Sequence, residues 1–180
     1  MKYIQIPTNF NYDKLEWGDV LVFAYMSYCK DPNTYRSWPN NSTISDKTDI
    51  KVEGVIGAKT RLIEQNWIQP KAFSDGLAFI FDKYDYNYVW IDTTFITNPF
   101  ITRNTKEFLL RVQPYIYKAN DNNGVIIKTP QELATLLNST EKDINRYFKL
   151  LQTNKAACRW KNHWVLNLTK INTPPGLYNW

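Results

Sequence analysis

Four polar side chains stand at helical spacing in the segment EKDINRYFKLLQTN (141–154), and their chemistry matches that of duplex DNA. Asn145 carries an amide that can pair with adenine, and Arg146 carries a guanidinium that can pair with guanine. Lys142 and Lys149 carry cations suited to phosphate groups. The spacing predicts that these residues face outward, opposite a buried apolar stripe made of Ile144, Tyr147, Phe148 and Leu151.

A second polar cluster follows in AACRWKNHWVLNLTKI (156–171), a stretch that predicts two strands around Lys161-Asn162. The tip of this hairpin would present Arg159, Lys161, Asn162 and His163, where a hairpin can follow the DNA backbone or enter the minor groove. Trp160 and Trp164 are expected to pack the hairpin onto its module and not to stack on bases.

The charge of the chain is unevenly distributed. Residues 1–98 hold ten Lys and Arg against twelve Asp and Glu, a net charge of −2. Residues 99–180 hold twelve against five, a net charge of +7. A basic half beside a nearly neutral half is typical of a polyanion-binding surface, although a solvated basic face explains the charge alone equally well.

The elements that would position these residues recur along the chain. Ile44–Ile68 aligns with Leu133–Ala157 at an offset of 89, which brings Val55 onto Ile144 and Leu62 onto Leu151. Asp49 falls on Asn138, the polar break between a short and a longer helix. The apolar anchors thus have the same spacing in both copies, which predicts that the same helix faces are buried twice.

The flanking segments complete two modules. A helix with Leu21, Ala24, Tyr25 and Tyr28 on one face is predicted in 18–31, and another in 104–120 that Pro114 ends or kinks. Two strands around Ser74-Asp75-Gly76 follow the first copy. We therefore expect an α+β, mostly helical chain of two modules, 1–98 with an ordered connector strand and 99–180 with an extended tail, each with three helices and a hairpin.

The first module offers a weaker set of candidate contacts. Its third helix, from about Lys51 to Gln65, is predicted to bury Val55, Ala58 and Leu62. Candidate DNA-contacting residues on this helix and the following hairpin are Lys51, Lys59, Thr60, Arg61 and Lys71. Because Gly54 and Gly57 lie inside the helix and the module is acidic overall, DNA contact and a purely structural or partner-binding role remain equally open here.

The motifs of several other classes of protein are absent from this chain. There is no G-x-x-x-x-G-K-[ST] loop and no G-x-G-x-x-G, so nucleotide binding by those devices is not expected. One histidine and no C-x-x-C pair argue against a Cys/His zinc site, and we expect no metal, no cofactor and no enzymatic activity. Without a signal peptide or a long apolar run, the chain is expected to be cytoplasmic and not to bind membranes.

The opening YIQIPTNF with LEWGDVLVFAYMSY and STISDKTDIKVEGVIGAKTRLIEQNWI resembles the N-terminal winged helix of phage and plasmid replication initiators and of DnaD-type primosomal proteins. LATLLNSTEKDINRYFKLLQTNKAACRW is similar to the winged helix that those initiators share with many bacterial repressors. The resemblance covers about residues 1–171 and implies tandem winged helix-turn-helix modules that bind an origin or operator through the third helix and wing. Gly54, Gly57 and Ala156-Ala157 depart from the family pattern.

Two functions from different classes follow from these observations. The first is a non-enzymatic, double-stranded DNA-binding protein of a phage or mobile element in a bacterial host cell, acting in replication initiation or transcription regulation. The second is a winged-helix module for protein contacts, for example with a host polymerase or in a virion, and the nearly neutral first half favours this alternative. A nuclease is a more distant third.

Overall fold

The computed structural model describes residues 3–74, 76–81, 88–99, 101–118 and 123–171. The predicted extended tail beyond Ile171 and residues 82–87 of the predicted connector lie outside this described part. Within it the chain is α+β, and its strands form antiparallel sheets in the orders β1-β5, β2-β4-β3 and β6-β7-β9-β8.

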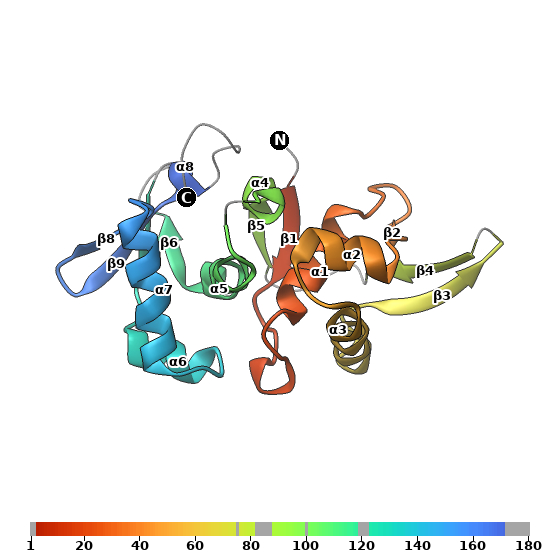
Figure 1. Cartoon of the computed structure of the whole chain (residues 1–180), viewed down its shortest axis with the longest axis horizontal. Helices are drawn as coiled ribbons and strands as arrows, with labels where there is room; N and C mark the ends of the chain where they lie inside the picture. The colour runs from red at the N-terminus through yellow and green to blue at the C-terminus, as the bar shows by residue number, and fades with distance from the viewer. Residues whose placement is uncertain (1–2, 75, 82–87, 100, 119–122, 172–180) are drawn as a thin grey trace.

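Strand β5 (Tyr88–Asp92) lies between two units. In both units the main helices are followed by a hairpin in the same order (Figure 1). The N-terminal unit runs from α1 to β4: α1 (Asp19–Tyr28), β2 (Arg36–Ser37), α2 (Asn41–Thr48), α3 (Val52–Glu64), β3 (Gln69–Phe73) and β4 (Gly76–Ile80). The C-terminal unit runs from α5 to β9: α5 (Arg103–Val112), η2 (Gln113–Tyr115), β6 (Ile116–Lys118), β7 (Asn123–Ile126), α6 (Pro130–Leu136), α7 (Glu141–Thr153), β8 (Ala157–Trp160) and β9 (His163–Asn167). The two hairpins, β3–β4 and β8–β9, lie at opposite ends of the long axis (Figure 1).

The repeat at an offset of 89 holds at the level of the backbone. Helices α3 and α7 have the same length and begin and end 89 residues apart. Asp49 and Asn138, which each follow the shorter helix, both adopt the left-handed conformation, with φ of 57° and 48°. After the longer helices, the amide of Trp67 donates to the carbonyl of Leu62 at 2.9 Å, and that of Ala156 donates to Leu151 at 2.8 Å. The sequence prediction of equivalent turns is confirmed.

Helix α1 lies at the centre of the molecule, and its surroundings differ from the sequence prediction of a single buried face. All of its residues from Asp19 to Ser27 are buried, because α2 and α3 pack on it from one side and α5 and β1 from the other. Its sequence is apolar all round, which is typical of a helix enclosed by other elements. The two units therefore share α1 in one continuous core.

The two strands that flank the N-terminal unit, β1 and β5, pair with each other. Strand β1 (Tyr3–Pro7) runs antiparallel to β5 (Tyr88–Asp92), with Tyr3 opposite Asp92 and Pro7 opposite Tyr88. The predicted connector strand is confirmed in Tyr88–Asp92, and α4 (Thr94–Thr97) follows it. Strands β1, β2, β6 and β7 were not predicted from the sequence, and the last strand was predicted to be longer than it is. The chain instead turns into a short helix, α8, at Leu168–Ile171.

Phe148 packs at the centre of the C-terminal unit. Its ring stacks on Trp164 with centroids 4.6 Å apart and meets Phe108 edge-on at 5.2 Å. Phe148 and the other predicted stripe residues Ile144, Tyr147 and Leu151 are all buried, as the spacing predicts. The stripe fixes which face of α7 points outward.

Truncation of this ring should therefore destabilise the protein. We expect Phe148→Ala to lower the free energy of unfolding by about 3–5 kcal/mol, because a buried aromatic leaves a cavity. Leu150→Ala, on the exposed side of the same helix, should cost only about 0.5 kcal/mol. Urea unfolding of both variants measures the difference, and equal losses would contradict this packing.

Candidate nucleic-acid interface

Helix α7 begins at a well-made cap. The hydroxyl of Thr140 accepts a hydrogen bond from the amide of Asp143 at 3.1 Å, and Glu141 and Asp143 place carboxylates in the first turn, where the helix dipole favours them. The buried stripe then turns the remaining face toward solvent. Of the predicted residues on this face, Lys142, Arg146 and Lys149 are exposed and Asn145 is half-buried. We call these four residues the basic face of α7.

Arg146 is oriented by its neighbours on the helix. Its Nη2 lies 3.2 Å from Oδ1 of Asp143, and its guanidinium carbon lies 5.2 Å from the centroid of the Tyr147 ring. An exposed ion pair of this kind contributes only about 0–1 kcal/mol, so a nucleic-acid ligand can displace it at small cost. The amide of Asn145 has a long contact of 3.5 Å with Glu141. Both side chains can therefore exchange their present partners for base edges.

The hairpin β8–β9 adds a second polar surface. Lys161, at the turn, adopts a left-handed conformation with φ of 54°, and Arg159, Lys161 and Asn162 are exposed while His163 is half-buried. The sequence prediction for the two tryptophans is half right. Trp164 is buried and packs on Phe148, whereas Trp160 is 55% exposed, and the Lys161 amine lies 4.9 Å from the centroid of its ring.

The N-terminal candidates are distributed differently. Lys51, Thr60 and Lys71 are exposed. Lys59 is buried, and its amine donates to Oδ1 of Asn41 at 2.7 Å; this burial lowers the pKa of the lysine. Its four-carbon stem turns toward α2 and the β4 strand, so the predicted phosphate contact by Lys59 is not available in this arrangement.

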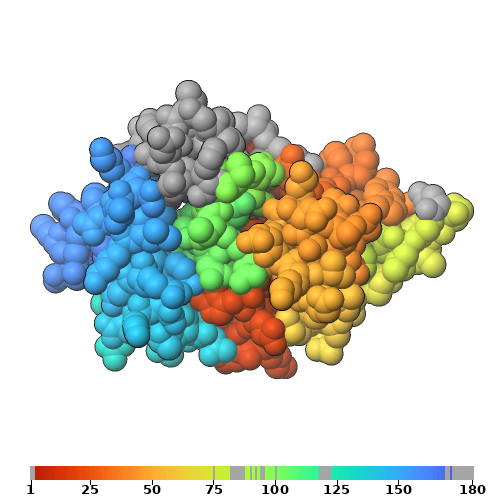
Figure 2. Space-filling model, viewed as in Figure 1, coloured from red at the N-terminus to blue at the C-terminus, as the bar shows by residue number. Residues whose placement is uncertain are grey.

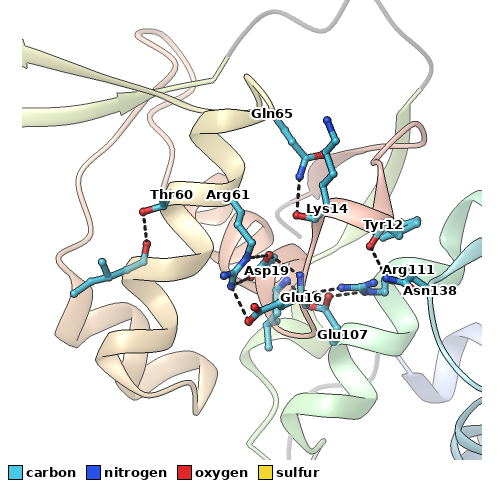
Figure 3. A network of polar contacts seen from close by, with 12 residues as sticks. Tyr12, Lys14, Glu16, Asp19, Thr60, Arg61, Gln65, Glu107, Arg111 and Asn138 are labelled. Carbon is cyan, nitrogen blue, oxygen red and sulfur yellow. Dashed lines mark hydrogen bonds and ion pairs between the residues drawn. The ribbon is translucent and has the colours of Figure 1, made fainter.

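Arg61 was predicted to face outward, but its guanidinium is bound by neighbouring carboxylates. Its Nε and Nη2 donate to the two carboxylate oxygens of Asp19 at 2.7 and 2.9 Å, and Nη2 lies 3.2 Å from Glu16 (Figure 3). The hydrogen bonds to Asp19 raise the pKa of Arg61. These two parallel hydrogen bonds between guanidinium and carboxylate hold α3 to the start of α1, and they occupy the guanidinium.

A second arginine, which the sequence analysis did not single out, joins the two units. Arg111 and Glu107 are fully buried on α5 and lie 2.7 Å apart. Arg111 also donates to the carbonyl of Glu16 at 2.7 Å and to that of Leu137 at 3.2 Å, while Glu107 accepts from the amide of Leu21 at 2.7 Å (Figure 3). The i,i+4 spacing of Glu107 and Arg111, on either side of the apolar run Phe108–Leu110, was the available sequence signal.

Equivalent positions in the two units carry opposite chemistry. At the offset of 89, the basic face of α7 corresponds on α3 to Glu53, Ile56, Gly57 and Thr60. The hairpins differ in length, because β8 and β9 close at Trp160 and His163 whereas β3 and β4 close at Phe73 and Gly76, two residues further along than the offset of 89 would place the closure. The outward face of α7 therefore presents three cations and an amide where the equivalent positions of α3 present one carboxylate and uncharged groups, whereas both hairpins carry exposed cations, Arg159 and Lys161 in one and Lys71 in the other.

No family model, curated protein sequence or solved structure matches the chain. No helix in the described residues is long and apolar enough to cross a membrane. In the same part of the chain, no three or more His, Cys, Asp or Glu side chains gather as a metal-binding group. What the chain does must be inferred from its own residues.

The buried Glu107–Arg111 pair should be sensitive to the loss of one partner. Arg111→Met leaves the Glu107 carboxylate buried and uncompensated, and we expect the free energy of unfolding to fall by about 3–5 kcal/mol. The matched exposed pair provides the control, because Arg146→Met should cost no more than about 1 kcal/mol.

Urea unfolding measures these losses. The double substitution Glu107→Leu with Arg111→Met removes both charges and should be at least about 1 kcal/mol more stable than Arg111→Met alone. Equal stabilities of Arg111→Met and Arg146→Met would contradict the structural role of the buried pair.

Proposed function

We propose that the chain is a non-enzymatic, double-stranded DNA-binding protein of a phage or mobile element, built from two winged helix-turn-helix modules in tandem (1–98 and 99–180). In this proposal it acts in replication initiation or transcription regulation in the cytoplasm of a bacterial host. One observation carries the proposal: the outward face of α7 presents three cations and an amide, and the equivalent positions of α3 hold none.

The dimensions of α7 support this proposal. A helix of 13 residues spans about 20 Å at 1.5 Å per residue, and the major groove of B-DNA is wide enough to admit one helix. In a helix-turn-helix, the second helix of the motif enters the major groove while the first crosses the backbone. Helices α6 and α7 have this relation in sequence, with the turn at Leu137–Thr140 between them.

Each residue of the basic face then has a role set by its chemistry. Arg146 reads guanine through two parallel hydrogen bonds, after its contact with Asp143 is broken, and Asn145 reads adenine. Lys142 and Lys149 bind phosphates on the two sides of the groove. Arg159 and Lys161 bring the hairpin to the backbone, where the exposed ring of Trp160 lies against the sugars or the minor groove.

Binding to duplex DNA should weaken steeply with salt. Phosphate contacts by Lys142, Lys149, Arg159 and Lys161 predict a slope of log K against log salt of about −3.6, since each contact contributes about −0.9. Lys149→Ala should reduce the magnitude of the slope by about 0.9. Lys51→Ala, on the N-terminal unit, should leave the slope unchanged.

Fluorescence anisotropy with a labelled duplex at several salt concentrations measures these slopes. Absence of binding to any duplex at low salt would contradict the proposed function. A reduced slope in Lys51→Ala as well would assign phosphate contacts to both units.

Base preference should depend on Arg146 and not on Lys149. Selection of bound sequences from random duplexes should yield a consensus with the wild-type protein. Arg146→Ala should relax this consensus at one position, with a loss of discrimination of about 1–3 kcal/mol. Lys149→Ala should weaken binding to all sequences equally, and a shifted consensus in that variant would contradict the assigned roles.

A further inference from the structure

The four-stranded sheet of the C-terminal unit has one covered face and one open face. On the covered face, Trp164 of β9 stacks on Phe148 of α7, and Ile126 and Leu166 are buried on the same side (Figure 1). Side chains alternate along each strand, so the residues between these point away from α7. A ligand on the open face therefore lies across the sheet from the basic face of α7.

The open face carries two exposed aromatic rings. The cross-strand register places six residues on it: Tyr117 on β6, Val125 on β7, His163 and Val165 on β9, and Cys158 and Trp160 on β8. We call these six residues the aromatic face. Tyr117 is 67% exposed and Trp160 55%. Since neighbouring strands lie about 4.8 Å apart, the strands that carry the two rings are roughly 14 Å apart across the sheet.

The charge of this sheet favours an anionic ligand. Its four strands contain no Asp or Glu. At the turn of the β8–β9 hairpin, at the left end of the molecule in Figure 2, the exposed Lys161 places its amine 4.9 Å from the centroid of the Trp160 ring. Among the described residues no carboxylate forms an ion pair with this amine. Arg159 adds a second exposed cation to the hairpin. The face therefore combines flat apolar rings with cations that an anionic ligand can reach.

We propose that the aromatic face binds single-stranded nucleic acid with little dependence on sequence. Bases of the strand stack on the rings of Tyr117 and Trp160, and its phosphates contact Lys161 and Arg159. Exposed aromatic rings beside cations suit a single strand, because every unpaired base offers a flat face and every nucleotide a negative charge. A cation beside an exposed ring is held weakly, so a phosphate can draw the Lys161 amine away from Trp160.

Duplex DNA matches this face less well. Its bases are already stacked and paired, so it would offer the Tyr117 ring only its sugars and phosphates. The proposal does not rest on duplex binding by α7, because α7 packs against the other side of the sheet. The two activities can therefore be separated by substitutions on the two sides.

Fluorescence anisotropy of the full chain with labelled oligonucleotides of about 12 nucleotides tests the proposal at low salt. We expect dT and dC oligonucleotides to bind with similar affinity. An abasic oligonucleotide of the same length keeps the phosphates and loses the stacking, so it should bind about tenfold more weakly or worse. Matched DNA and RNA strands show which of the two is the better ligand, since only a contact with the 2′-hydroxyl distinguishes them.

Substitutions at Tyr117 separate stacking from other contributions. Tyr117→Leu keeps an apolar side chain and removes the ring, and it should weaken single-strand binding about tenfold, whereas Tyr117→Phe should preserve binding. Trp160→Leu should have the same effect as Tyr117→Leu. The matched control is Tyr3→Leu, which removes a tyrosine of comparable exposure (52%) from β1 and should leave binding unchanged.

The charge contact and the site are tested by two further variants. Lys161→Met should reduce the magnitude of the salt slope for the single strand by about 0.7. Arg146→Ala should leave single-strand affinity unchanged, and Tyr117→Leu should leave duplex affinity unchanged. A chain that binds the single strand but no duplex would contradict the function proposed above and support this site. Duplex binding without single-strand binding would do the reverse.

Several other results would overturn the proposal. These are equal affinity for the abasic oligonucleotide, unchanged binding in both Tyr117→Leu and Trp160→Leu, and an equal loss in Arg146→Ala. Competition by polyglutamate as strong as that by an unlabelled oligonucleotide would assign the face to an acidic protein partner instead. Circular dichroism of each variant checks that the fold is kept.

Discussion

The buried ion pair of Glu107 and Arg111 is the contact on which the placement of α7 depends. It lies where α5 meets the start of α1, and Arg111 donates to the carbonyl of Glu16, just before α1, and to that of Leu137 in the C-terminal unit. Leu137 ends α6 and begins the turn into α7, and Asn138 in that turn also donates to the carbonyl of Tyr12 at 3.4 Å. The segment before α1 therefore holds α6, α7 and the turn between them from outside the C-terminal unit. Figure 2 shows this segment, in red, between the two units.

The two units show how one backbone arrangement can serve two chemistries. The turns, caps and apolar anchors that shape the helices recur at an offset of 89, because these features determine the fold. The outward positions are not needed for packing, and their residues differ almost completely. Arg146 on α7, for example, corresponds to Gly57 on α3. Cations that remain in the N-terminal unit, such as Arg61 and Lys59, are engaged in contacts that hold the unit together.

Sequence patterns predicted well those features that depend only on residues within one helix or hairpin. The ranges of α3 and α7, their buried stripes and the presence of turns at Asp49 and Asn138 follow from local periodicity and polar breaks, whereas the left-handed conformation of both turn residues was not predicted. Errors arose where the deciding partner is distant in sequence. Arg61 is engaged because Asp19 lies 42 residues earlier, α1 is enclosed on both sides because α5 folds onto it, and β1 exists because β5 returns to pair with it. Trp160 was placed wrongly because alternation along a short hairpin does not tell which face is covered.

We propose that the C-terminal unit, and not its N-terminal counterpart, presents the DNA-contacting surface. Lysine acetylation read by mass spectrometry, with and without a saturating duplex, tests this claim most directly at low salt. We expect DNA to protect Lys142, Lys149 and Lys161 from acetylation, while Lys51 and Lys71, which are also exposed, react as before. Protection of Lys51 and Lys71 with continued reaction at Lys142 and Lys149 would contradict it.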